Sequence, residues 1–122
     1  MHPPSGRTIL VLDDDPDVRR LVGLALSRRG HRVVQAATTR EALEAVERDL
    51  PDLLVVDLML PERDGEEFLE ACRERLPKRP PVVLLTASAA RREVARRVEA
   101  DIAMAKPFEL AELAAVVDNL LS

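Results

Sequence analysis

The chain has 122 residues, the usual size of one domain, with a net charge of −4 and only two aromatic residues, Phe68 and Phe108. The negative charge argues against nucleic acid as a partner, because phosphate binding requires a basic surface. No apolar run approaches the roughly 20 residues of a membrane span, and the single Cys72 cannot form an internal disulfide. These features predict a cytoplasmic protein with an aliphatic core and no membrane contact.

Short apolar runs alternate with longer segments of helical periodicity. Runs that are apolar on both sides are typical of strands buried between two layers. The predicted strands are residues 8–12, 31–36, 52–56, 81–85 and 101–105. A helix is predicted after each one, which favours an α/β fold with a five-stranded parallel sheet and helices on both faces. We expect residues 1–6 to form a loose tail and residues 7–122 to form the domain.

The first two predicted helices carry clear start signals. Asp15 is a capping acid before Pro16, a residue favoured at the first helical position, and Gly30 suits the end of this helix. Thr38 and Glu41 have the spacing of a capping box, which predicts the start of the second helix.

The remaining helices are predicted from apolar spacing. The third is expected to open at Asp64 and Gly65 and to turn Phe68 inward. The fourth, over about residues 88–99, is poor in apolar residues. The fifth is expected to begin after Phe108.

Polar residues that could perform chemistry follow four of the predicted strands. In an open parallel sheet, ligands bind beyond the carboxyl ends of the strands, where the strand order reverses. For a strand order of 2-1-3-4-5, that point lies between the first and third strands. The residues at these strand ends are Asp13, Asp14, Asp15, Asp57, Thr86 and Lys106. Neither His2 nor His31 falls there, and His31 is expected at the surface, at the start of a strand.

Asp13, Asp14 and Asp57 are expected to lie side by side on this rim. Two unit charges at about 4 Å repel by about 4 kcal/mol at an effective dielectric constant near 20, so a proton or a cation must relieve the repulsion. Ligands that are all oxygens suit Mg²⁺. A simpler interpretation of the aspartates after the first strand is helix capping, which we expect for Asp15.

Four sequence segments together resemble a known family. They are ILVLDDDPDVRRLV at 9–22, PDLLVVDLMLPERDG at 51–65, PVVLLTAS at 81–88 and AKPF at 105–108. In this order and spacing they resemble the receiver domain of two-component response regulators, the CheY-like superfamily. The resemblance covers essentially the whole chain and implies a doubly wound (βα)5 flavodoxin-like fold with strand order 2-1-3-4-5.

The resemblance implies a role for each residue on the rim. Asp57 is similar to the phosphoacceptor. Asp14 resembles the direct Mg²⁺ ligand, Asp13 its water-mediated partner, and the backbone carbonyl of Met59 a further ligand. Thr86 would hydrogen-bond the phosphoryl group.

Lys106 resembles the cation that neutralises the phosphoryl group, and its peptide bond to Pro107 is expected to be cis. The chain departs from the family pattern at Ala103, which stands where an aromatic residue is usual, and the segment from Thr86 to Lys106 is about two residues shorter than in the family.

By the same resemblance, the chain is a phosphorylation switch and not an enzyme in the ordinary sense. A histidine kinase or a histidine phosphotransfer protein would donate the phosphoryl group, and the first helix is the expected docking side. A homodimer through residues 88–122 is a further expectation.

Two alternatives stay open at this stage. A small phosphatase of the haloacid dehalogenase type would use Asp13 as nucleophile and Asp15 as acid–base. Against it, Asp17 stands where that motif has Thr or Val. The other alternative is a scaffold that binds partners without being phosphorylated.

Overall fold

A computed structural model describes residues 7–57, 62–86, 93, 96 and 99–122. These residues form a parallel sheet in the order β2-β1-β3-β4-β5. The strands are β1 (Thr8–Leu12), β2 (Arg32–Ala36), β3 (Leu53–Asp57), β4 (Val82–Thr86) and β5 (Ile102–Ala105). The predicted α/β fold and strand order are therefore confirmed. Four strands begin one residue later than expected, and Asp57 and Thr86 are the last residues of their strands.

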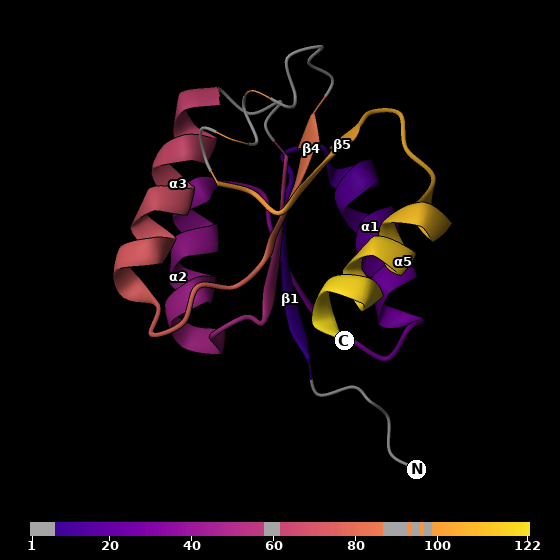
Figure 1. The fold of residues 1–122 in the computed structure, drawn as a ribbon, viewed down its shortest axis with the longest axis horizontal. Helices are drawn as coiled ribbons and strands as arrows, with labels where there is room; N and C mark the ends of the chain where they lie inside the picture. The colour runs from indigo at the N-terminus through magenta and orange to yellow at the C-terminus, as the bar shows by residue number, and fades with distance from the viewer. Residues whose placement is uncertain (1–6, 58–61, 87–92, 94–95, 97–98) are drawn as a thin grey trace.

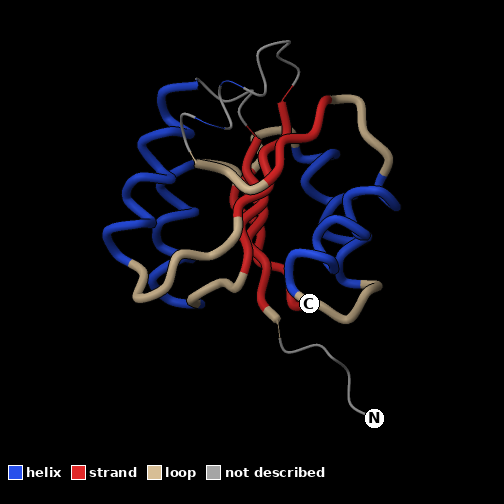
Figure 2. The backbone as a smooth tube through the Cα atoms, viewed as in Figure 1, coloured by secondary structure: helices blue, strands red, loops and turns tan. Residues whose placement is uncertain are grey.

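Helices cover both faces of this sheet. Helices α1 (Pro16–Ser27) and α5 (Leu110–Leu121) lie on one side, and α2 (Thr39–Asp49) and α3 (Glu62–Arg75) lie on the other (Figure 1, Figure 2). The helix predicted over residues 88–99 falls mostly outside the described residues. In the described part of the chain, no helix is long and apolar enough to cross a membrane.

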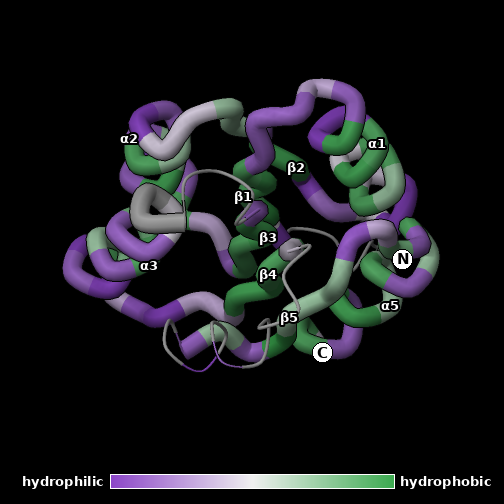
Figure 3. The backbone as a smooth tube through the Cα atoms, turned by 90° about the horizontal axis from the view of Figure 1, so that it is seen from above, coloured by the Kyte–Doolittle hydropathy of each residue, from purple (hydrophilic) through white to green (hydrophobic). Residues whose placement is uncertain are grey.

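The two faces of the sheet build two aliphatic cores. Alternate residues of β1 point to opposite sides: Leu10 packs in the core under α2 and α3, and Val11 packs in the core under α1 and α5. Every residue of β1, β3 and β4 is buried, as expected for strands covered on both faces. Figure 3 shows the strands of the sheet mainly in the hydrophobic colour, between helices that each carry both hydrophobic and hydrophilic residues.

The predicted caps of α1 and α2 are confirmed. The Asp15 side chain accepts hydrogen bonds from the backbone N–H groups of Asp17 and Val18. Gly30, with a φ of 91°, lies in the turn beyond the end of α1. In α2, the Thr38 hydroxyl accepts a hydrogen bond from the Glu41 N–H at 3.1 Å.

The predicted start of α3 at Asp64 is wrong. This helix begins at Glu62, and Gly65 lies buried within it. Acidic residues are favourable throughout the first turn of a helix, so an acidic residue next to glycine does not identify one starting position.

The predicted exposure of His31 is also wrong, because its side chain is only 7% exposed. Its Nε2 lies 2.7 Å from the carboxylate of Asp118 in α5, which also pairs with Arg29 at 2.5 Å. The contact joins residues 87 positions apart in the sequence, so no local pattern could predict it. It ties the connection between α1 and β2 to α5.

The Thr38 cap provides a test of the local energetics. Thr38→Ala is expected to lower the free energy of unfolding by about 1 kcal/mol, because the Glu41 N–H loses its acceptor. Urea unfolding followed by circular dichroism measures this change. Thr38→Ser keeps the hydroxyl and is expected to stay close to the wild type; equal losses in both variants would contradict the capping role.

Candidate functional site

Strand register brings the predicted acidic residues together. Leu12 of β1 pairs with Val56 of β3, so the residues that follow them, Asp13 and Asp57, are neighbours across the two strands. Both strands are parallel, and their carboxyl ends therefore meet on the same edge of the sheet. The reversal of strand order between β1 and β3 keeps this edge open to a ligand.

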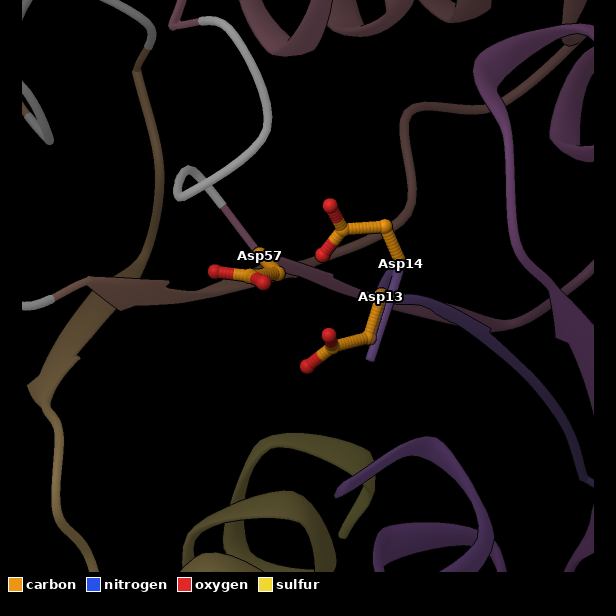
Figure 4. A group of neighbouring side chains, drawn as sticks. All are labelled: Asp13, Asp14 and Asp57. Carbon is orange, nitrogen blue, oxygen red and sulfur yellow. The ribbon is translucent and has the colours of Figure 1, made fainter. Parts of the chain in front are cut away.

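The carboxylates of Asp13, Asp14 and Asp57 form one compact group. One oxygen from each lies within 4.8 Å of the others, and Figure 4 shows the three side chains around a common space. Asp13 and Asp57 are fully buried, whereas Asp14 is exposed. The group therefore has two inner carboxylates and one that faces the solvent.

Asp13 is held by backbone hydrogen bonds at both its main chain and its side chain. Its N–H donates to the Ala36 carbonyl of β2 at 3.2 Å, and its Oδ1 accepts from the Asp15 N–H at 2.9 Å. Burial raises the pKa of Asp13 from 3.8 to about 6, and the neighbouring carboxylate of Asp57 adds to this rise. The Asp15 N–H and the charge of Lys106 act in the opposite direction.

Lys106 lies against both inner carboxylates. Its Nζ is 3.1 Å from Asp57 and 3.5 Å from Asp13, and its side chain is 20% exposed. Its backbone N–H donates to the Thr86 carbonyl at 2.9 Å, and its peptide bond to Pro107 is cis, as expected. Thr86 is buried at the end of β4, one residue beyond Leu85, the partner of Asp57.

The donor set fits a divalent cation. In the described part of the chain, Lys106 is the cation paired with this group of three carboxylates, which leaves excess negative charge. The buried Oδ2 of Asp13 accepts no hydrogen bond from the described residues. Carboxylate oxygens around a common space are ligands that Mg²⁺ prefers, and a divalent ion would bring the formal charge of the group to zero. Met59, the other predicted ligand, lies outside the described residues.

One contact at this site was not predicted from the sequence. Nη1 of Arg19, in the first turns of α1, donates to the backbone carbonyl of Asp13 at 2.8 Å. The sequence places Arg19 beside Arg20 on a helix that was expected to serve for docking. Helical periodicity places Arg19, with Val18 and Leu21, on the side of this helix expected to border the rim. Arg19 is partly buried, while Arg20 is exposed. The periodicity does not predict the hydrogen bond of Arg19 to the Asp13 carbonyl.

Comparison with known proteins connects this geometry to a family. The model of the response regulator receiver domain matches residues 9–118. An uncharacterised 14.6 kDa protein of Leptolyngbya boryana is 42% identical over 115 residues, which cover 91% of this chain and 87% of the relative. Response regulator MprA of Mycobacterium leprae is 42% identical over 117 residues, covering 93% of this chain and 50% of MprA. The chain thus spans about half the length of several curated relatives that it matches.

Solved structures give the same result. Chemotaxis protein CheY4 of Vibrio cholerae superimposes with a TM-score of 0.82 at 27% identity, over 93% of this chain and 98% of CheY4. The BeF3-activated receiver domain of DrrB gives a TM-score of 0.81 at 29% identity, over 94% of this chain and 97% of that one. With a matching family model, similar sequences and a common fold, the chain belongs to the response regulator receiver domains of two-component signalling systems.

Proposed function

We propose that this chain is a phosphorylation switch in which Asp57 accepts a phosphoryl group. The observation that carries the proposal is the convergence of Asp13, Asp14, Asp57 and Lys106 at the carboxyl ends of parallel strands. The donor would be a phosphorylated histidine of a kinase or of a phosphotransfer protein. We propose that the receiver unit comprises residues 7–122; the loose tail predicted for residues 1–6 lies outside the described residues.

The chemical step needs a nucleophile and positive charge, but no acid–base residue. A carboxylate oxygen of Asp57 forms a bond to phosphorus while the bond from phosphorus to the donor imidazole nitrogen breaks and leaves its electron pair on that nitrogen. The product is a mixed anhydride, a form of covalent catalysis by aspartate. Lys106, 3.1 Å from Asp57, is suited to offset the charge on the transferred oxygens. The Thr86 hydroxyl is proposed to donate a hydrogen bond to one of them.

Asp13, Asp14 and Asp57 are proposed to hold Mg²⁺, with the carbonyl of Met59 as a further ligand. When bound, Mg²⁺ would neutralise negative charge on the phosphoryl oxygens and on the acidic group. Because Asp14 is exposed while Asp13 is buried, Asp14 is the better placed of the two for direct coordination of an ion that enters from solvent.

The phosphatase alternative assigns an acid–base role to Asp15, the residue that caps α1. Its Oδ1 accepts two N–H groups of α1, so an acid–base role would fall to its other oxygen, Oδ2. Docking of the donor along α1 and a homodimer through residues 88–122 remain proposals. The scaffold alternative is tested directly by phosphorylation.

Phosphorylation is tested with acetyl phosphate and Mg²⁺, followed by mass spectrometry to locate the modified residue. We expect one phosphoryl group on Asp57 of the wild type and none on Asp57→Asn, because an amide cannot form the anhydride. Removal of Mg²⁺ by a chelator is expected to abolish labelling. Asp17→Asn, which removes an exposed acid of α1, is the matched control and is expected to be labelled normally.

Each alternative predicts a different outcome of this experiment. Turnover of acetyl phosphate through Asp13 would support the phosphatase, and an unlabelled wild type would support the scaffold. Labelling that persists on Asp57→Asn would show that the acceptor lies elsewhere.

Burial of Asp13 predicts a pH-dependent cost to stability. Its pKa is raised from 3.8 to about 6, so between these values the folded protein holds a proton that the unfolded chain has lost. Stability therefore falls as pH rises through this window, and the cost is complete above about pH 6. Without metal, Asp13→Asn is expected to raise the free energy of unfolding at neutral pH by about 1–3 kcal/mol.

Urea unfolding at several pH values measures this effect. The difference between Asp13→Asn and the wild type is expected to vanish below about pH 4, where both states are protonated. Mg²⁺ is expected to stabilise the wild type more than the variant. A difference that stays constant from acidic to neutral pH would contradict this account of Asp13.

A further inference from the structure

Arg19 contacts the peptide group that joins two proposed metal ligands. Its Nη1 donates to the Asp13 carbonyl at 2.8 Å, in a partly buried position. That carbonyl and the N–H of Asp14 belong to one planar peptide unit. A hydrogen bond to the carbonyl therefore also limits the orientation of the Asp14 backbone, from which the Asp14 carboxylate projects.

The other hydrogen bonds around Asp13 hold different atoms. The bond to Ala36 fixes the Asp13 N–H, and the bond from Asp15 fixes its side chain. The bond from Asp15 closes a turn over residues 13–15, so it already restricts the peptide that leads to Asp14, an exposed residue. The contact from Arg19 is made to the carbonyl oxygen of that peptide and adds a second constraint on its orientation.

The charge of Arg19 is not used in an ion pair within the described chain. No carboxylate of the described residues lies within ion-pair distance of Arg19, whereas Arg20 lies 3.8 Å from Asp17. A positive charge near a cation site would by itself weaken cation binding. Any benefit of Arg19 to such a site must therefore come from its hydrogen bond.

We propose that Arg19 is a positioning residue for the divalent cation: it orients the Asp13–Asp14 peptide so that the Asp14 carboxylate is presented to Mg²⁺. This inference rests on the proposed function, because it requires Mg²⁺ to bind at Asp14. It assigns to α1 a role in building the site, in addition to any role in docking.

The sign of the change in Mg²⁺ affinity separates the possible roles of Arg19. Loss of a positioning hydrogen bond weakens Mg²⁺ binding, whereas loss of a nearby positive charge strengthens it. A residue used only for docking leaves the affinity unchanged. Because the chain has no Trp or Tyr, backbone amide NMR is a suitable measurement.

The experiment is a Mg²⁺ titration of the wild type, Arg19→Ala, Arg19→Lys and Arg20→Ala, with urea unfolding as a check that each variant is folded. Arg19→Ala is expected to bind Mg²⁺ about 10-fold more weakly, within the usual range for residues that support metal ligands. Arg19→Lys, which keeps a charged donor, is expected to recover part of this loss. In the metal-free protein, the Asp14 amide resonance is expected to shift in Arg19→Ala.

Arg20→Ala is the matched control, because it removes the same charge from the neighbouring, 75% exposed side chain. It is expected to bind Mg²⁺ as tightly as the wild type or slightly more tightly. Unchanged or tighter binding by Arg19→Ala would overturn the inference, even if the variant binds phosphorylation partners poorly.

Asp14→Asn in the same titration separates this inference from the proposed function. If Asp14→Asn weakens Mg²⁺ binding but Arg19→Ala does not, the result supports the proposed metal site and contradicts the positioning role of Arg19. If the wild type shows no Mg²⁺ binding at these residues, both are wrong.

Discussion

Three carboxylates meet at the carboxyl ends of β1 and β3, and the surrounding contacts limit the cost of this concentration of charge. The parallel register makes Asp13 and Asp57 neighbours, and both are buried. Lys106 lies against both, and the Asp15 N–H supplies a further hydrogen bond to Asp13. The group still carries excess negative charge, and two of its three carboxylates are buried. Burial and the charge of Asp57 raise the pKa of Asp13, and the excess charge favours binding of a divalent cation.

The rigidity of the fold makes such a group possible. The strands behind the carboxylates are buried on both faces, so their ends cannot easily move apart to relieve repulsion. Adjacent residues differ in what their side chains do: that of Asp15 caps α1, while those of Asp13 and Asp14 belong to the acidic group proposed to bind the metal. The three residues that precede α1 therefore supply both the helix cap and two members of the acidic group.

At Ala103 this chain lacks the aromatic residue that its resemblance to receiver domains led us to expect. Ala103 pairs with Leu84 of β4 and packs, partly buried, against the core under α2 and α3. A methyl side chain cannot change rotamer, so if Asp57 is phosphorylated as proposed, we expect the change to be transmitted by other contacts, beginning at Thr86. The neighbouring segment 87–92 lies outside the described residues.

The strands, the caps at Asp15 and Thr38, and the polar residues at strand ends could be predicted from the sequence, because they depend on local periodicity and on hydrogen bonds within a few residues. The sequence also predicted the sheet order through the resemblance of its motifs. Two contacts could not be predicted from it: the hydrogen bond from Arg19 to the Asp13 carbonyl, and the burial of the His31 side chain against Asp118. These contacts depend on how α1 packs against the sheet and on how the segment before β2 packs against α5. Such packing cannot be predicted from the pattern of neighbouring residues in the sequence.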